Sequence, residues 1–313
     1  MNEKINYSII IPHKNIPDLL QRCLASIPRR EDVQIIVVDD NSDPDKVDFE
    51  HFPGLGDPFV EVVFTKEGKG AGYARNVGLT KAVGKWLLFA DADDFFNYCI
   101  NDILDEYVNS DADIVCFKHN SLDSATYTNT GNSTFYNSYI DYWLYLRKKN
   151  EYFLRYGYVV VWSKIIKRDL VNKYCISFDE VYISNDVAFS YFAGFYANSI
   201  CADPRALYCN TIRQGSIRHN KLTIENCLDL IYVDGKRYRF FREHNIPAYE
   251  KIAFINILIK LYFNNRTYFR KAKDILLNLN FTSTEIIRLY IIYFLVYIPK
   301  RIKRKYLHQR IIL

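Results

Sequence analysis

The sequence predicts an α/β fold in which a mostly parallel sheet carries helices on both faces, followed by a helical appendage. Two observations support this prediction. In the first part of the chain, short apolar runs rich in β-branched residues alternate with stretches of helical periodicity. After about Asp203 the pattern changes to long Leu, Ile, Tyr and Phe runs with helical spacing, broken at Pro247, Asn264 and Thr282. We therefore expect two domains, residues 1–215 and 216–313.

The expected sheet is built from short apolar segments with little polar alternation, as is typical of strands that are buried on both faces. The expected strands are residues 7–12, 33–40, 60–65, 85–90 and 112–118. A first helix is expected after Pro17 and a second over residues 71–83. Strands that alternate with helices in this way favour βαβ units and hence parallel pairing.

Composition narrows the cellular setting. The 313 residues are 49% hydrophobic and carry a net charge of +5, which suits a globular chain with a large core. Seven cysteines are scattered without C-x-x-C spacing, which argues against a disulfide framework and against a zinc site. The first residues, "MNEKINYSIIIP", lack the apolar core of a secretory signal. We expect a cytoplasmic protein, and no nucleic-acid-binding motif is evident.

Polar stretches follow three of the expected strands. They are "PHKN" after the first strand, "DDNSD" after the second and "DADD" after the fourth. In an open parallel sheet, ligands bind outside the carboxyl ends of the strands. We therefore expect these three loops to direct their side chains into one crevice.

The "DADD" stretch is the strongest chemical signal in the chain. Asp91 and Asp93 are two residues apart after a strand, so an extended backbone sends both carboxylates to one side. Mg²⁺ and Mn²⁺ prefer such oxygen ligands and commonly take one or two protein carboxylates when a diphosphate supplies the others. The alternative is a solvated acidic turn before the helix expected near Asn101.

Four motifs together resemble a known family. The stretches "SIIIPHKN", "QIIVVDDNSD", "GYARNVGL" and "LLFADADDFF" occur in the order and spacing of the family 2 inverting glycosyltransferases, whose fold is the Rossmann-like GT-A fold. The match is close over about residues 5–120 and weaker to about 215. The resemblance implies transfer of a hexose or N-acetylhexosamine from a nucleotide-diphosphate donor, first of all a UDP-sugar. The implied acceptor is a glycan or lipid-linked hydroxyl in bacterial capsule, O-antigen or exopolysaccharide synthesis.

The resemblance also implies roles for individual residues. The implied donor-binding residues are Pro12, Asn15, Asp40, Arg75, Asp91 and Ala92. The implied metal, Mn²⁺ or Mg²⁺, is bound directly by Asp93, with Asp91 beside it. Asp40 matches a carboxylate that accepts the uracil N3 proton, and Arg75 matches a guanidinium that reaches the phosphates. Without the resemblance, Asp40 equally fits an Asx turn and Arg75 an exposed helix face.

The candidate catalytic base lies far downstream of these motifs. In "YISNDVAFSYFAGF", Asp186 heads an apolar helix and resembles the Asp of the family's Glu-Asp pair, while Asn185 replaces the Glu. An Asp within reach of the acceptor hydroxyl can remove its proton as the sugar is transferred with inversion. The alternative is a helix N-cap. The stretch "VVVWSKIIKRDL" also resembles family sequences, and Trp162 lines the acceptor side or packs in the core.

Two other functional classes share features with this sequence. A phosphatase with a D-x-D nucleophile is disfavoured because its motif usually follows the first strand and has Thr or Val where this chain has Phe95. A catalytically silent nucleotide-sugar-binding or scaffold protein with the same fold stays open because Asn185 departs from the family pattern.

The C-terminal tail combines an apolar stretch with a basic cluster. Leu289–Ile298 is too short to span a bilayer, which takes about 20 residues. The cluster that follows contains Lys300, Arg301, Lys303, Arg304 and Lys305. This combination favours peripheral contact with anionic lipid on the inner face of the plasma membrane. The alternative is a helix that packs on the protein. The sequence does not define an oligomeric state.

Overall fold

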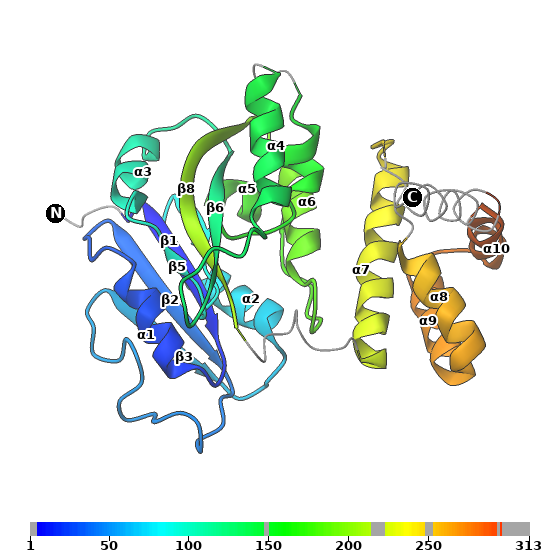
Figure 1. Cartoon of the computed structure of the whole chain (residues 1–313), viewed down its shortest axis with the longest axis horizontal. Coiled ribbons are helices and arrows are strands. Elements are labelled where there is room, and N and C mark those ends of the chain that lie inside the picture. Colours follow the sequence, from blue (N-terminus) through cyan, green and yellow to red (C-terminus); the bar gives the residue numbers. More distant parts are fainter. Residues whose placement is uncertain (1–4, 147–149, 214–222, 248–252, 293–294, 296–313) are drawn as a thin grey trace, which may run out of the picture. The chain divides into compact units, whose positions relative to one another are not determined.

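The structure is a computed structural model that describes residues 5–146, 150–213, 223–247, 253–292 and 295. The chain divides into two compact units, residues 1–220 and 221–313 (Figure 1). Each unit has its own cluster of buried apolar side chains, as expected when two segments fold around separate cores.

The described residues of the first unit form one eight-stranded sheet with the order β3-β2-β1-β4-β7-β6-β8-β5. The strands are β1 (Tyr7–His13), β2 (Val33–Asp40), β3 (Val60–Thr65), β4 (Trp86–Phe89), β5 (Phe95–Phe96), β6 (Ile114–Asp123), β7 (Lys164–Lys167) and β8 (Ile200–Ile212). Strand β1 pairs in parallel with β2 and β4, β2 with β3, and β6 with β8. The predicted α/β fold with a mostly parallel sheet is therefore confirmed.

The second half of the sheet differs from the expectation. Strand β7 is antiparallel to both β4 and β6, and the two-residue β5 is antiparallel to β8. Strand β8 was not among the expected strands. It carries polar residues among its apolar ones, so its strand character comes from pairing with β6 rather than from a local pattern.

Helices pack against this sheet (Figure 1). They are α1 (Pro17–Ala25), α2 (Ala71–Lys81), α3 (Ile100–Tyr107), α4 (Thr134–Tyr145), α5 (Arg168–Lys173) and α6 (Asp186–Tyr196), with a π-helix, η1, at Phe153–Gly157. Pro17 occupies the first turn of α1, where its missing N–H costs nothing. Helix α2 packs on β1 and β2, and α4 packs on β6 and β8.

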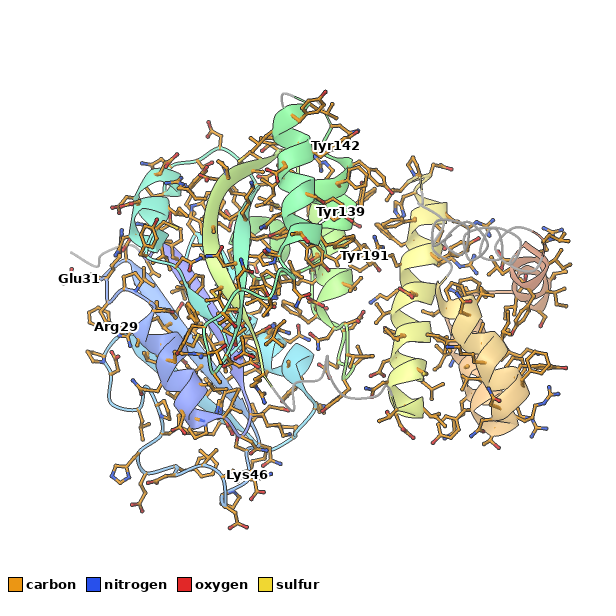
Figure 2. The ribbon with its side chains drawn as sticks, in the orientation of Figure 1. Arg29, Glu31, Lys46, Tyr139, Tyr142 and Tyr191 are labelled. Atoms are coloured by element: carbon orange, nitrogen blue, oxygen red, sulfur yellow. The ribbon has the colours of Figure 1, made fainter. Side chains whose placement is uncertain are left out.

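Aromatic contacts join α4 to the π-helix η1. Tyr139, labelled on α4 in Figure 2, stacks on Phe153 with ring centroids 5.1 Å apart, and Tyr142 meets the edge of the same ring at 5.3 Å. Trp162 is 3% exposed and stacks on Tyr208 of β8 with ring centroids 5.2 Å apart. Trp162 is thus a core residue, and offset aromatic stacking of this kind adds to the burial of both rings.

The described part of the second unit is helical. It contains α7 (Ile224–Glu243), α8 (Ala253–Asn264), α9 (Arg266–Asn278) and α10 (Ser283–Ile292). The side chain of Thr223 accepts a hydrogen bond from the Asn226 amide and so caps α7, and Asn265 caps α9 through the Tyr268 amide. Asn264 ends α8 and Thr282 precedes α10, as the sequence breaks predicted.

The C-terminal tail falls mostly outside the described residues, and so does its whole basic cluster from Lys300 to Lys305. In α10, Leu289 is buried in the core of the second unit. Leu289 is therefore a core residue of the second unit, and membrane contact by the stretch that begins there stays a prediction. Ile287, Ile291 and Leu295, spaced four residues apart, are instead exposed. Within the described part of the chain, no helix has the length and apolarity needed to cross a bilayer.

Candidate functional site

Hydrogen bonds link the polar loops that follow β1 and β2. The Asn15 amide donates to Ser42 Oγ at 2.8 Å, and Asn15 Oδ1 accepts from the Asp43 amide at 2.7 Å. Asn15 has a φ of 59°, a left-handed conformation that Asn tolerates better than most residues. The Asn15 side chain therefore holds the loop after β1 to the loop after β2. Pro12, inside β1, is buried opposite Val38 of β2.

Asp39 and His13 form a buried pair beneath these loops. His13 Nδ1 lies 2.7 Å from Asp39 Oδ1, and Ser42 donates to Asp39 through both its amide and its hydroxyl. Burial by itself raises the pKa of Asp39, but the hydrogen bonds from His13 and Ser42 outweigh it and leave that pKa below its ordinary value. The pair fixes the carboxyl end of β2.

Asp40, the next residue, holds the start of α2. Its carboxylate accepts from the Lys69 amide at 3.0 Å and from the Gly70 amide at 2.7 Å, and Lys14 Nζ lies 3.5 Å away. Gly70 has a φ of 94°, which favours glycine at this turn. Asp40 is only 2% exposed. Asp40 lies at the end of β2, as expected. Its carboxylate oxygens already accept hydrogen bonds from the glycine-rich loop.

Arg75 of α2 joins two distant parts of the candidate site. Its Nη2 donates to Asp91 Oδ1 at 2.5 Å and its Nη1 donates to Asn185 Oδ1 at 2.7 Å. Arg75 is buried, with 7% of its side chain exposed. Among the described residues its Nε has no hydrogen-bond partner. A planar fork of donors suits such a bridge.

The approach of α2 to the segment before α6 is close. A Cβ on Gly72 would lie 2.1 Å from the carbonyl oxygen of Asp179 and 3.1 Å from Asn185 Cβ. Only glycine fits there without displacing the backbone of the neighbouring segment. This close packing keeps Asn185 within reach of Arg75.

The "DADD" stretch is held by side chains from several strands and helices. The Asp91 amide donates to Tyr208 Oη at 2.8 Å. The carbonyl oxygen of Asp93 accepts from Arg22 Nη2 at 2.5 Å and from Thr211 Oγ1 at 2.6 Å. Ala92, between them, is buried. The backbone of the motif is thus fixed by β8 and α1, while the Asp91 and Asp93 side chains stay partly exposed.

The acidic residues of this motif are in different environments. Asp94 is buried and accepts from the Thr211 amide at 2.6 Å and from Asn210 Nδ2 at 3.0 Å. Burial first, and then the charges of Asp93 and Asp91, raise the pKa of Asp94 well above its ordinary value. The pKa of Asp93 is raised by burial and by Asp91, and Arg213, whose Nε lies 3.0 Å from Asp93 Oδ2, lowers it in part. Asp94 is thus a structural residue, and Asp93 carries a cationic partner.

The carboxylates fit a divalent cation. Apart from Arg75 on Asp91 and Arg213 on Asp93, no residue that the structure describes forms an ion pair with these two carboxylates. The described ranges contain no group of three or more His, Cys, Asp or Glu that could hold a metal. A hard cation with two carboxylate ligands takes its other ligands from water or phosphate. The chemistry of this donor set therefore suits Mg²⁺ or Mn²⁺ bound together with a diphosphate.

Asp186 is the first residue of α6 and follows Asn185 directly. The Asn185 side chain makes no capping hydrogen bond to α6, because its Oδ1 accepts from Arg75 instead. Burial raises the pKa of Asp186; Arg75 opposes this effect, Asp91 adds to it and Lys164 opposes it. A carboxylate whose pKa is raised towards neutrality is a better proton acceptor.

Several residues of the site were not predicted from the sequence. Arg22 and Arg213 bind Asp93, Tyr208 binds the Asp91 amide, and Lys164 interacts with Asp186. Each lies more than 20 residues from its partner, so no local pattern reveals the contact. The one available signal was Lys164 in the "WSK" stretch, whose family likeness was noticed without a role for the lysine.

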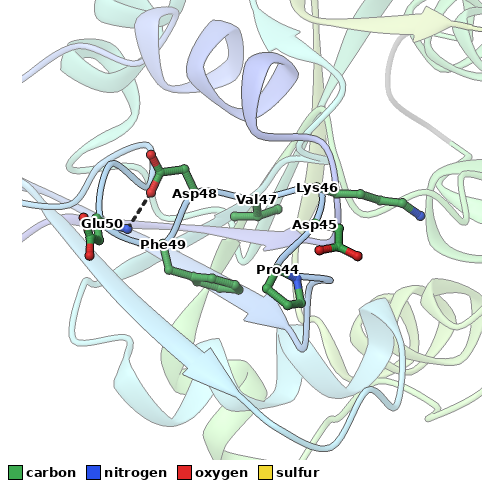
Figure 3. Close-up of a pocket in the computed structure, with 7 residues that line it drawn as sticks. All are labelled: Pro44, Asp45, Lys46, Val47, Asp48, Phe49 and Glu50. Atoms are coloured by element: carbon green, nitrogen blue, oxygen red, sulfur yellow. Dashed lines mark hydrogen bonds between the residues drawn. The ribbon is translucent and has the colours of Figure 1, made fainter.

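A surface depression lies elsewhere on the first unit (Figure 3). It is lined by Pro44, Asp45, Lys46, Val47, Asp48, Phe49 and Glu50, and Figure 3 shows the hydrogen bond from the Glu50 amide to Asp48. All seven residues belong to one segment after β2. None of them is a predicted site residue, so this depression is separate from the linked network around Arg75.

Comparison with known proteins gives relatives of one kind. The family model described as glycosyl transferase family 2 matches residues 8–175. The glycosyltransferase GlyG of Streptococcus pneumoniae is 26% identical over 247 residues, which are 74% of this chain and 78% of GlyG. The putative glycosyltransferase EpsH of Bacillus subtilis is 26% identical over 262 residues, covering 78% of this chain and 72% of EpsH.

Solved structures share the fold. The S. aureus TarS fragment 1–349 in complex with UDP-GlcNAc matches with a TM-score of 0.58 at 20% identity, covering 84% of this chain and 74% of the fragment. The mannosyltransferase PcManGT from Pyrobaculum calidifontis, in complex with GDP-Man and Mn²⁺, matches with a TM-score of 0.54 at 14% identity, covering 91% and 78%. The sheet described above is thus the GT-A sheet. Because the family model covers more than half of its length, the chain belongs to glycosyl transferase family 2.

Proposed function

We propose that this glycosyltransferase is a metal-dependent inverting enzyme that moves a sugar from a nucleotide-diphosphate donor to a hydroxyl of a glycan or lipid-linked acceptor. The observation that supports it best is the Arg75 bridge. One guanidinium connects Asp91, beside the candidate metal ligand Asp93, with Asn185, beside the candidate base Asp186. Inverting transfer needs a leaving-group site and a proton acceptor held in fixed relation, and this bridge supplies the connection.

The donor is proposed to be a UDP-sugar, with a hexose or N-acetylhexosamine. Structures with the same fold hold UDP-GlcNAc in one case and GDP-Man with Mn²⁺ in another. The proposed donor-binding residues are Pro12, Asn15, Asp40, Arg75, Asp91 and Ala92. Asp40 and Asn15 already form hydrogen bonds with the loops around them. Their part in donor binding is therefore mainly to shape the surface that binds the nucleobase of the donor.

Asp93 and Asp91 would hold the divalent cation, Mn²⁺ or Mg²⁺. When bound, such an ion neutralises charge that grows on the departing diphosphate. Arg213 and Arg75 each occupy one oxygen of these carboxylates. Arg213 lowers the pKa of Asp93 in part, against the larger effects of burial and of Asp91.

Asp186 is proposed as the general base. An Oδ atom of its carboxylate would take the proton from the acceptor hydroxyl. The hydroxyl oxygen would meanwhile attack the sugar on the face opposite the diphosphate. The reaction is then a single displacement without a covalent enzyme intermediate. Arg75 orients the segment that carries the base by holding Asn185, and Gly72 lets that segment approach α2.

The experiment that tests this function begins with a screen of UDP-, GDP- and dTDP-sugars for donor hydrolysis with and without Mn²⁺. With the active donor and a glycan acceptor, Asp186→Asn should keep donor binding and lower transfer about 10²-fold or more. The matched control is Asp169→Asn, an exposed first-turn acid of α5, which should transfer at the wild-type rate. Wild-type transfer by Asp186→Asn would mean that the base lies elsewhere.

A second candidate is a catalytically silent nucleotide-sugar-binding protein with the same fold. The specific observation in its favour is Asn185, a neutral residue where the family pattern has Glu. This alternative predicts calorimetric binding of a nucleotide sugar without turnover on any acceptor tried. Turnover with any one acceptor would exclude it.

We also infer a division of labour along the chain. Residues 1–215 would form the catalytic domain and 216–313 a helical region whose tail meets the membrane surface. Ile287 and Ile291, one turn apart in α10, are exposed, and so is Leu295, which precedes the basic cluster in the sequence. Apolar side chains followed by lysines and arginines suit an anionic lipid surface. The enzyme would then work at the cytoplasmic face of the plasma membrane in surface-polysaccharide synthesis.

A further inference from the structure

Lys164, the first residue of β7, is a buried lysine in the first unit. It is 3% exposed. Lysine is rarely buried to this extent unless an acid pairs with it, because removing the ammonium group from water costs several kcal/mol. Among the described residues, Lys164 has no carboxylate within ion-pair distance. The fold therefore keeps a cation in its interior at a cost.

Two contacts fix the position of the ammonium group. Lys164 Nζ donates to the carbonyl oxygen of Tyr158 at 2.5 Å and lies over the ring of the same residue, 5.2 Å from its centroid. It also donates to Ser190 Oγ at 3.4 Å. Ser190 lies in α6, so the second contact joins β7 to the helix that begins at Asp186.

The position of Ser190 relates Lys164 to the proposed base. Asp186 and Ser190 are four residues apart in α6, so their side chains lie on the same face of the helix, one turn from each other. The Lys164 ammonium group therefore lies about one helical turn from the Asp186 carboxylate. Each group shifts the titration of the other, which agrees with this distance.

We propose that Lys164 is a positioning residue of the transfer reaction, whose buried charge stabilises the ionised, proton-accepting form of Asp186. The proposal rests on the proposed function in taking Asp186 as the base. It assigns to the lysine of the "WSK" stretch an electrostatic task that acts through Asp186, without contact with donor or acceptor. A cation in a low-dielectric interior acts on a neighbouring carboxylate more strongly than it would in water.

Other charges act on this pair as well. Arg75 from α2 lowers the pKa of Asp186 more than Lys164 does, and Asp91 from the loop after β4 raises it. Arg75 differs from Lys164 in being bound to Asp91 and Asn185, so a change at Arg75 would disturb these contacts together with its charge. Lys164 interacts with Cys116 of β6 besides Asp186, and burial lowers the pKa of Lys164 to about 8. Lys164 is thus cationic at neutral pH and loses its charge in mild alkali.

A double-mutant cycle in urea unfolding tests the interaction without any activity assay. The proteins are wild type, Lys164→Met, Asp186→Asn and the double variant. At pH 7 the cycle should give a favourable coupling of about tenfold in the folded-to-unfolded ratio. At pH 9.5, where Lys164 is neutral in the folded protein, the coupling should vanish. If Lys164→Met does not fold, Lys164→Gln takes its place.

The matched control is Lys167 of the same strand. Lys167 pairs with Asp113 at 3.1 Å and is more exposed than Lys164. A cycle of Lys167→Met with Asp186→Asn should give no coupling at either pH. Absence of coupling between Lys164 and Asp186 at pH 7, or an equal coupling at pH 9.5, would overturn the proposal. Either result would mean that Lys164 only fills space and binds the Tyr158 carbonyl.

The pH profile of kcat/KM tests the role of Lys164 in the reaction. The rate is measured as UDP release from UDP-GlcNAc or from whichever donor the screen identifies. Loss of the Lys164 charge should move the acidic limb of the profile about one pH unit higher in Lys164→Met. Lys167→Met should leave the limb in place. A uniform loss of rate at every pH would indicate a structural role. Coupling in the cycle together with no turnover of any donor would contradict the proposed function and not the Lys164–Asp186 interaction.

Discussion

Arg75 lies 2.5 Å from Asp91 and, through its other terminal nitrogen, 2.7 Å from Asn185. The sequence had suggested that this arginine reaches the donor phosphates. Its guanidinium instead donates hydrogen bonds to two protein groups. One is Asp91 in the candidate metal-binding motif, and the other is Asn185, beside the proposed base. Donor binding by Arg75 would have to use the remaining edge of the guanidinium or follow a rearrangement of this bridge.

Replacing Arg75 by lysine should separate charge from geometry. Lysine keeps the positive charge but cannot donate to Asp91 and Asn185 simultaneously from a planar fork. We expect Arg75→Lys to lower transfer by a factor of about 10², with a smaller loss of UDP affinity. The measurements are UDP release and calorimetry with UDP. Arg29→Lys, at a surface pair with Asp57, is the control and should change neither. Equal rates for Arg75→Lys and wild type would show that the bridge is dispensable.

Asp93 should determine metal-supported nucleotide binding. In Asp93→Asn a neutral amide replaces a hard anionic ligand, so UDP affinity in the presence of Mn²⁺ should fall about tenfold or more. UDP affinity without metal should change little. Calorimetric titrations with UDP, with and without Mn²⁺, measure both. Asp45→Asn, an exposed acid outside the network, is the control. If both variants bind UDP and Mn²⁺ like wild type, Asp93 is not the metal ligand.

The buried pair of Asp39 and His13 predicts a pH dependence of stability. The pKa of Asp39 is lowered in the folded protein, so between its folded and unfolded values the unfolded chain binds more protons and stability rises with pH. At pH 7 the free energy of unfolding of wild type should exceed that of Asp39→Asn by about 1–3 kcal/mol. The difference should shrink as the pH falls below about 4.

Thermal unfolding of both proteins at pH 7, 5, 4 and 3 measures this difference. The control is Asp48→Asn, because Asp48 and His51 form a pair of the same length, 2.7 Å, on the surface. Its effect should be much smaller, since water screens the exposed pair. An Asp39→Asn penalty that stays constant from pH 7 to pH 3 would contradict the assignment of a charged Asp39.

The tail should carry membrane affinity that is separate from folding. A chain that ends at Ile292 keeps the core residue Leu289 and removes the basic cluster, so it should fold and lose binding to anionic vesicles at low salt. Co-sedimentation with phosphatidylserine-containing vesicles is the measurement, and neutral vesicles are the control. In the full chain, Ile287→Asp with Ile291→Asp should also weaken pelleting. Pelleting of all these proteins alike would mean that the tail does not mediate membrane contact.

The motif order of the first half was sufficient to predict the first strands and the polar loops that follow them. Strands β1, β2 and β4 are mostly apolar and end in polar loops, and both properties are local in the sequence. Hydrophobic pattern determines these strands because each is buried on both faces. The acidic Asp91 and Asp93 likewise follow from position, since they stand at the end of a predicted strand.

The partners of these residues were decided by tertiary structure. Arg22, Tyr208, Thr211 and Arg213 come from α1 and from β8 and its end, and β8 reaches the motif only because it pairs with β6 and β5. In the sequence, Lys164 looks like any polar residue at the start of a strand. Only the folded chain brings it against Ser190 of α6. By itself, the sequence thus determined the strands β1 to β4, the loops at their ends and the acids that these loops carry. Only the tertiary structure decided which cations and hydroxyls meet those acids, because contacts between residues far apart in the chain depend on strand order and helix packing rather than on local pattern.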